Sequence, residues 1–423
     1  MIRAGNPRLR AVEAFPVQHE GQRCIALRDP AGFTDRIAVL PGPLLDLVSL
    51  FDGEHPVEAI HEILRRRHGE APSVDQIGAL IEQLDDAGFL DSERFRARRR
   101  ATDDAFRQSP TRPAAHAGGA YAGEPEALRE QIAGFFRHPD GSSPADGSSP
   151  AEGAGPADGP SRRAAGTLSA LIAPHIDFHR GAPTYGRAYK EVLDRSDADL
   201  FVILGTCHAG MADPFAITLK PYDTPLGPAT VDRDFYEALA RRAGQDLLAS
   251  EPAHRAEHSI EFQAVMLQYL LGARRPFTIL PVLASYLHEA VWAGTEPEAD
   301  PRVPRFLDAL GETIASSPRR VCLIAGVDLA HVGPRFGDPD ANTEASLATL
   351  EQADRAMLEP VVAGDARGFF ARVAADGDAR RICGLSPIYS LLRVLPEAPG
   401  RLIQYRQWPD PEGAVTFCAV SFP

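Results

Sequence analysis

The order of apolar and amphipathic segments after residue 165 limits the fold of this chain more than any other feature. Continuous apolar runs of strand length stand at 168–173, 199–205, 277–283 and 320–327. Stretches with helical periodicity alternate with them, at 184–193, 233–244, 258–271 and 305–314. Short apolar runs separated by helices are typical of strands buried on both faces of a sheet.

The C-terminal part continues the pattern with two further helices and two final strands. The helices are expected over roughly 342–361 and 387–396, and the strands near 401–408 and 414–422. We therefore predict a three-layer α/β/α domain with a mixed central sheet.

Residues 1–100 have a different pattern, and we expect a small helical domain there. Short helices are predicted over 42–53 and 56–69, and the next helix begins at Ser73, where Gln76 completes a capping box. Gly88 ends that helix, and the residues after it are expected to form a hairpin-like tail. Three short helices and such a tail favour a winged-helix-like domain.

Two segments interrupt these domains. The run 101–111, within a stretch of charge, Pro and Gly without periodicity, is predicted to be a linker. Residues 138–164 contain the repeat DGSSPA twice and almost no apolar side chains. Such a segment cannot offset its chain entropy by burial, so we expect it to be disordered.

Bulk composition narrows the classes of partner. The net charge of −14 disfavours general nucleic-acid binding, although arginines at 65–67 and 94–100 leave a DNA-binding alternative for the first domain. No apolar run reaches membrane-span length and the first residues lack a signal-peptide pattern, so we expect a cytoplasmic protein without membrane contact. The five cysteines form no CxxC pair, which disfavours a disulfide framework and a closed structural zinc site.

Polar residues collect where the predicted strands end, which is where α/β sheets carry their functional groups. His175 and Asp177 follow the first strand, and Cys207 with His208 follow the second. Further candidates, on a later strand end and at two helix starts, are Asp328, His331, Glu257, His258, Glu261 and Cys383. Imidazole and thiolate together suit zinc, copper or iron, and three protein ligands with an open position suit catalysis.

These motifs, in their order along the chain, resemble the Memo family, which includes the bacterial AmmeMemoRadiSam system protein B. The matching segments are PHIDFHRGAPTYGRAY, ILGTCHAG, EHSIEFQ, VDLAHVGPRFG and ICGLSPIYSLL, preceded by AHAGGAY. The resemblance covers about 112–423, with 138–164 as an insertion. It implies a fold similar to class III extradiol dioxygenases. The first domain more diffusely resembles small peptide-recognition domains.

The resemblance also implies a site of two histidines and one cysteine. Its ligands here would be His175, His208 and Cys383, holding one metal ion, with iron or copper favoured and zinc a third choice. His331 would stand at the acid/base histidine of the dioxygenases, whose glutamate ligand has no counterpart here. That difference places ring cleavage itself in doubt.

The remaining candidates have supporting roles or ordinary explanations. Asp328 can fix an imidazole or cap a turn, and Asp177, Glu257 and His258 can line the pocket. Glu257 and Glu261 also suit the first turn of a helix for electrostatic reasons. Cys207 points away from His208 if the chain is extended, so we interpret it as a packing residue.

Three functions stay open from the sequence. The first is a metal-dependent oxidoreductase, and the second is a non-enzymatic adaptor that binds a peptide or a radical-enzyme partner through residues 1–100. The third is a hydrolase or transferase with Cys383 as nucleophile, because a helix N-terminus stabilises a thiolate.

Overall fold

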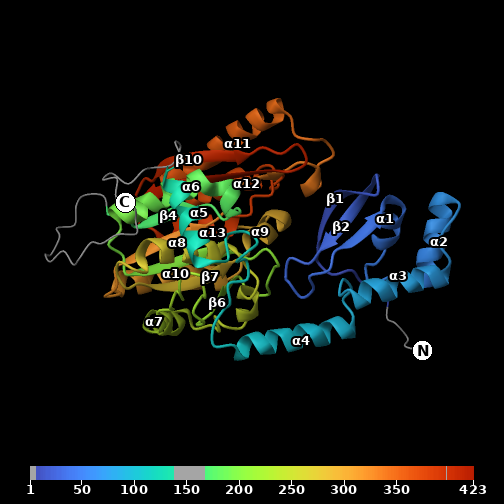
Figure 1. Cartoon of the computed structure of the whole chain (residues 1–423), viewed down its shortest axis with the longest axis horizontal. Coiled ribbons are helices and arrows are strands. Elements are labelled where there is room, and N and C mark those ends of the chain that lie inside the picture. Colours follow the sequence, from blue (N-terminus) through green and yellow to red (C-terminus); the bar gives the residue numbers. More distant parts are fainter. Residues whose placement is uncertain (1–5, 138–166, 397) are drawn as a thin grey trace. The chain divides into compact units, whose positions relative to one another are not determined.

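The computed structural model describes residues 6–137, 167–396 and 398–423 (Figure 1). They divide into two compact units. The first runs to Gln108 and includes Pro334–Asp340, and the second comprises Ser109–Gly333 and Ala341–Pro423. The segment 138–164, which we expected to be disordered, lies outside the described residues.

The larger unit is built on one mixed sheet with the strand order β10-β11-β4-β8-β5-β7-β6. The strands are β4 (Ala170–Ala173), β5 (Leu200–Thr206), β6 (Phe215–Ile217), β7 (Thr278–Ala284), β8 (Val321–Gly326), β9 (His331–Val332), β10 (Arg401–Trp408) and β11 (Ala414–Phe422). Strands β4, β8, β5 and β7 run parallel, whereas β6, β10, β11 and the short β9 pair antiparallel with their neighbours.

Helices cover both faces of this sheet (Figure 1). On one face lie α5 (Pro125–Arg137), α6 (Phe178–Arg195) and α8 (Ser259–Leu271). On the other lie α7 (Arg233–Ala243), α9 (Leu287–Ala293), α10 (Arg302–Ser316), α11 (Glu344–Ala363), α12 (Ala366–Ala374) and α13 (Leu385–Val394). The predicted three-layer α/β/α architecture is confirmed.

Strand β5 shows why the sheet needs both layers. Leu200, Val202 and Leu204 belong to the hydrophobic core beneath α7, α10 and α13. Phe201 and Ile203 belong to the opposite core, beneath α6 and α8. Because side chains alternate along a strand, a continuous apolar run must be covered on both faces.

Two glycines allow α8 to approach the ends of the central strands. A Cβ atom added to Gly205 would lie 2.5 Å from Ser259 Oγ, and one added to Gly326 would lie 2.5 Å from the Ser259 carbonyl oxygen. Any side chain at these positions would displace the first turn of α8. The glycines therefore set the distance between the strand ends and the residues that begin this helix.

The smaller unit begins with a three-stranded antiparallel sheet, which the sequence analysis did not predict. It consists of β1 (Glu13–His19), β2 (Gln22–Arg28) and β3 (Ala38–Pro41) in the order β1-β2-β3. The helices α1 (Gly42–Val48), α2 (Val57–His68), α3 (Val74–Asp86) and α4 (Glu93–Gln108) follow. The predicted capping box of α3 is present, with Ser73 Oγ accepting from the Gln76 amide.

One expectation for this unit was wrong. The hairpin-like tail is absent from the described residues, because Leu90 forms only an isolated bridge with Leu9 before α4 begins. The run 101–111, expected to be a linker, contains the boundary between the two units at Gln108 and is helical up to that residue. Helix α4 was not predicted from the sequence because it has no periodic apolar stripe. Its buried side chains are only Phe95 and Phe106, which lie three turns apart.

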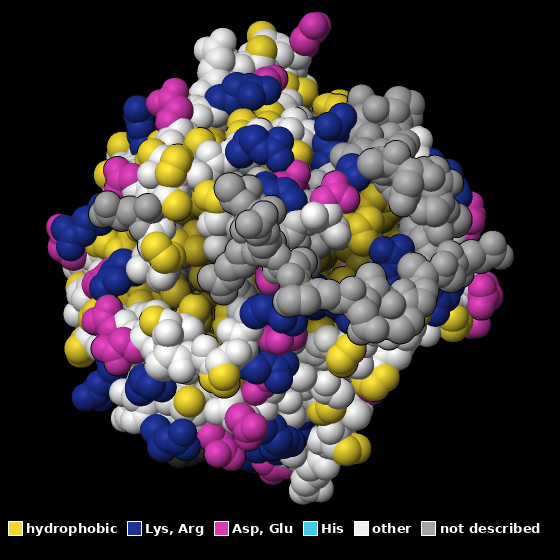
Figure 2. Space-filling view, turned by 90° about the vertical axis from the view of Figure 1, so that its left-hand side faces the viewer, with side chains coloured by type: hydrophobic (Ala, Val, Ile, Leu, Met, Phe, Trp, Pro, Cys, Tyr) yellow, Lys and Arg dark blue, Asp and Glu magenta, His cyan; other side chains and the backbone are white. Residues whose placement is uncertain are grey.

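None of the described helices is both long enough and apolar enough to cross a lipid bilayer. On the face shown in Figure 2, basic and acidic side chains are interspersed. The described residues of that face therefore form no continuous basic surface of the kind that binds a phosphate backbone.

Candidate metal centre

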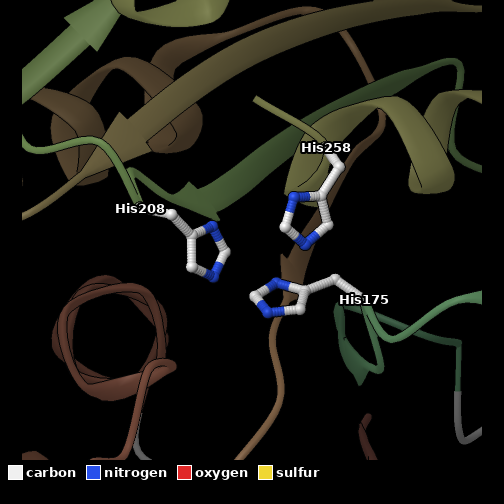
Figure 3. Close-up of side chains that lie close together, drawn as sticks. All are labelled: His175, His208 and His258. Atoms are coloured by element: carbon white, nitrogen blue, oxygen red, sulfur yellow. The ribbon is translucent and has the colours of Figure 1, made fainter. Parts of the chain in front are cut away.

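Three histidines from separate parts of the larger unit converge at the carboxyl ends of the central strands. His175 follows β4, His208 follows β5, and His258 precedes the first residue of α8. One ring nitrogen from each lies within 4.8 Å of the others, and Figure 3 shows the three rings facing a common space. The ring centroids of His208 and His258 are 4.6 Å apart, and each is 4.9 Å from that of His175.

Two of the three imidazoles are hydrogen-bonded to the protein through Nδ1, and the third, His258, approaches the same carboxylate as His208 through its Nδ1. His175 Nδ1 lies 3.0 Å from the Gly326 carbonyl oxygen. Glu257 Oε1 lies 3.0 Å from His208 Nδ1 and 3.4 Å from His258 Nδ1. Metal-binding histidines are held in this way, because an acceptor on one ring nitrogen fixes the tautomer and orients the other nitrogen. The arrangement therefore fits a metal ion bound through Nε2 atoms.

Cys383 lies beside the same cluster, just ahead of α13. Its Sγ is 3.3 Å from His175 Nε2 and 3.4 Å from the Asp328 carbonyl oxygen, and His208 is close enough to influence the thiol electrostatically. Burial raises the pKa of this thiol, although the neighbouring His208 acts in the opposite direction. Without a bound metal ion, the sulfur is therefore held as a thiol rather than as a thiolate, even beside the charged His208.

Glu257 organises one side of the cluster from a nearly fully buried position. Its carboxylate accepts hydrogen bonds from the backbone amides of His208 (2.8 Å), His258 (2.8 Å) and Ser259 (3.0 Å), in addition to His208 Nδ1. Burial alone would raise its pKa, but the charge and hydrogen bonds of His208 hold the pKa of Glu257 well below its usual range. Glu257 is therefore an anion that draws two histidine-bearing segments together.

The charge of Glu257 divides the three histidines into two kinds. Burial lowers the pKa of His208, but Glu257 and Cys383 outweigh it, and the net pKa of His208 is raised well above its usual value. Burial and the charge of His208 lower the pKa of His175, and bring that of His258 to about 3. His175 and His258 are therefore neutral and can bind a metal ion directly, whereas His208 must lose a proton when a metal ion binds.

Asp328 and His331, the predicted catalytic pair, lie on the β8 side of the cluster. Asp328 Oδ1 accepts from the backbone amides of His175 (3.0 Å) and Ile176 (3.2 Å), and burial raises its pKa to about 7. His331 Nδ1 lies near the carbonyl oxygens of Leu329 (3.1 Å) and Arg381 (3.2 Å), and burial lowers its pKa to about 4. Asp328 therefore fixes the turn that carries His175, and His331 is a neutral imidazole.

Other predicted residues lie at the edge of the cluster or outside it. Asp177 directly precedes α6 and pairs with Arg180 at 3.8 Å, and its side chain is 39% exposed. Cys207 is buried in the core between the sheet and α6 and α8, where burial strongly raises the pKa of its thiol. Cys207 and His208 thus belong to different environments, as expected for neighbours in an extended chain.

Sequence reasoning did not single out Arg112 and Tyr121, and it treated Glu261 only as a helix-start acid. All three side chains are buried and meet behind the His258 turn. A sequence signal for them existed, because α8 is apolar around its whole circumference and a buried acid there requires a partner.

The fold and this site define an α/β protein with a histidine cluster at the carboxyl ends of its parallel strands, and comparison with known proteins identifies the family. Residues 112–419 match the family described as Memo-like protein, so this chain belongs to the Memo-like family.

Relatives come from both bacteria and archaea. The chain is 26% identical to a MEMO1 family protein of Aquifex aeolicus over 78% of this chain and 77% of that protein. It is 27% identical to one of Thermus thermophilus, over 83% and 93% of the two chains. Identity to one of Methanopyrus kandleri is 29%, over 74% and 98% of the two chains.

Proposed function

We propose that this protein binds one redox-active metal ion, iron or copper, through His175, His208 and Cys383, and acts as an oxidoreductase. The observation that carries the proposal is the fixed orientation of His175 and His208, whose Nδ1 atoms are hydrogen-bonded to a carbonyl oxygen and a carboxylate oxygen respectively. The imidazole and thiol donors also fit zinc.

Two residues compete for the third ligand position. Cys383 Sγ is in contact with both His175 and His208, and a bound cation would favour its thiolate. His258 completes the cluster of three mutually close imidazoles and is held by the same carboxylate as His208. We propose Cys383 as the ligand and His258 as a pocket residue. A cobalt(II) titration distinguishes this assignment from the one with His258 as the ligand.

His331 would provide the proton chemistry beside the metal, and Asp328 would support the site. The metal ion would supply Lewis acidity or electron transfer to a bound substrate. His331 is neutral at physiological pH and is oriented by two carbonyl oxygens, so it can accept a proton at its other nitrogen. Asp328 would act through the His175 turn, as a positioning residue.

A cobalt(II) titration tests the ligand set. The full chain should bind one equivalent with a thiolate-to-cobalt absorption band, and Cys383→Ser should lose that band and at least 10-fold in affinity. His258→Ala should retain the band. If Cys383→Ser behaves as wild type while His258→Ala loses binding, the third ligand is His258; fast alkylation of Cys383 that cobalt does not slow would favour the nucleophile instead.

A second candidate function, a peptide-binding adaptor, rests on the smaller unit. Among the described residues, strand β3 is the last strand of its sheet and pairs only with β2. Val39 in this strand is 37% exposed, and Ile37 just before it is 57% exposed. A groove of about 440 Å³ runs between this strand and helices α1 and α3, with Leu44, Leu80, Leu84 and Ala87 in its lining. An open strand edge next to an apolar groove is suited to adding an extended peptide.

Selection of displayed peptides against the full chain tests the adaptor function. We expect extended sequences with alternating apolar residues, and at least 10-fold weaker binding by Leu80→Glu. Val74→Glu is the matched control, because Val74 is on the same helix and is 39% exposed but does not line the groove. Equal losses in both variants, or no enriched peptides, would contradict the adaptor function.

A further inference from the structure

A buried charged cluster lies directly behind the turn that carries Glu257 and His258. Arg112 and Glu261 are completely buried and form an ion pair, and Tyr121, 2% exposed, donates its hydroxyl to the same carboxylate. Arg112 and Tyr121 precede residues 138–166, whereas the histidines of the site all follow that segment. The cluster therefore joins two distant parts of the chain.

The guanidinium of Arg112 binds the backbone of the 254–257 turn at both ends. Its Nε donates to the His254 carbonyl oxygen (2.9 Å), and its Nη2 donates to the Glu257 carbonyl oxygen (2.5 Å). Its Nη1 donates to Glu261, on the first turn of α8. One planar group thus fixes the entry and the exit of the turn together with the helix that follows.

Glu261 holds this assembly from the other side. Besides Arg112 and Tyr121, it accepts hydrogen bonds from the backbone amides of Ala115 (3.2 Å) and His116 (3.0 Å). The carboxylate is fully satisfied, so the segment around residues 112–121 is tied to the start of α8. Replacing a buried ion pair by apolar residues often costs no stability, so stability alone is a weak explanation for such a pair.

We propose that Arg112, with Glu261 and Tyr121, positions the metal centre. By holding the Glu257 carbonyl oxygen, Arg112 fixes the backbone from which the Glu257 carboxylate reaches His208 and His258. This inference rests on the proposed metal-binding function. If Arg112 has this role, the metal centre requires the segment around residues 112–121 in addition to the segments that carry its histidines.

Cobalt(II) binding by the full chain tests the proposal. The double variant Arg112→Met/Glu261→Met removes both charges together, and Tyr121→Phe removes one hydroxyl. The matched control is Tyr389→Phe, because Tyr389 donates to Glu298, which also binds Arg393, in a second arginine–glutamate–tyrosine cluster. The readouts are the dissociation constant, the visible cobalt spectrum and the thermal midpoint.

We expect the double variant to bind cobalt at least 10-fold more weakly and with an altered spectrum, and Tyr121→Phe to show a smaller change in the same direction. Tyr389→Phe should lower the midpoint without changing affinity or spectrum. If the double variant does not fold, Tyr121→Phe decides alone. Wild-type affinity and spectrum in the folded variants would overturn the positioning role, whereas absence of cobalt binding by the wild type would overturn the metal-binding function itself.

Discussion

Glu257→Gln is expected to weaken metal binding by about 10- to 100-fold, the usual effect of losing a residue that orients a metal-bound histidine. The amide keeps the size of the carboxylate but removes the charge that holds His208 and His258. It also turns one acceptor into a donor beside four groups that donate. We expect the free energy of unfolding of the metal-free protein to fall by about 2 kcal/mol as well.

Competition with a chromophoric chelator measures the affinity, and urea unfolding at pH 7 measures the stability. Glu237→Gln is the control, because Glu237 is 65% exposed on α7 and pairs only loosely with Arg241, at 3.9 Å. Unchanged metal affinity in Glu257→Gln would show that Glu257 does not orient the ligands.

Acidification from pH 7.5 to pH 5 is expected to cost the metal-free larger unit about 2 kcal/mol through His254, while the buried Asp328, whose pKa is raised to about 7, gains a proton and acts in the opposite direction. Burial lowers the pKa of His254 and His258 to about 3 and that of His331 to about 4. An unfolded histidine titrates near 6.5, so below that pH the unfolded chain binds more protons than the folded one. The stabilisation that comes from burying these histidines in their neutral form is complete above pH 6.5. It is lost as the pH falls towards their pKa values in the folded protein.

The size of this effect follows from the exposure of the histidines. The fully buried His254 contributes about 2 kcal/mol over this range, and the partly exposed His258 and His331 contribute less each. His208 does not add to the loss, because its raised pKa keeps the His208–Glu257 pair charged throughout this range.

Tryptophan fluorescence is a selective probe for this experiment, because both tryptophans, Trp292 and Trp408, belong to the larger unit. His254→Gln should flatten the dependence of the unfolding free energy on pH. His19→Gln, which removes an exposed histidine from β1, should leave it unchanged. A His254→Gln variant with the same pH dependence as wild type would contradict the burial argument.

The α/β domain could be predicted because its strands are buried on both faces and its helices have clear apolar stripes. All four predicted apolar runs are strands β4, β5, β7 and β8. The sheet of the smaller unit was missed because β1 is only partly buried and mixes polar residues and a proline with few apolar ones, and because β3 has only four residues and ends in proline. Strand periodicity requires a clean apolar face, which these strands lack.

The histidine cluster could be anticipated from the positions of His175 and His208 at strand ends. The network behind it could not be anticipated in full, because Arg112 and Glu261 are 149 residues apart and the sequence does not show which residue is the partner of the buried acid. Likewise, Glu257 has the ordinary features of a helix-start acid, and only the fold shows that its carboxylate points toward two histidines. Local sequence identifies candidate groups, whereas their partners depend on contacts between distant segments.

The most direct test of the central claim is the metal content of the full-length protein, isolated without oxygen and without chelators, compared with that of His208→Ala. The wild type is predicted to contain about one equivalent of iron or copper, and His208→Ala almost none. His179→Ala, a neighbouring histidine that packs on Trp408 at 6.0 Å, should retain the wild-type amount. A wild-type protein that neither contains nor takes up iron, copper or zinc, or a His208→Ala variant with unchanged content, would contradict the claim that this cluster is a metal centre.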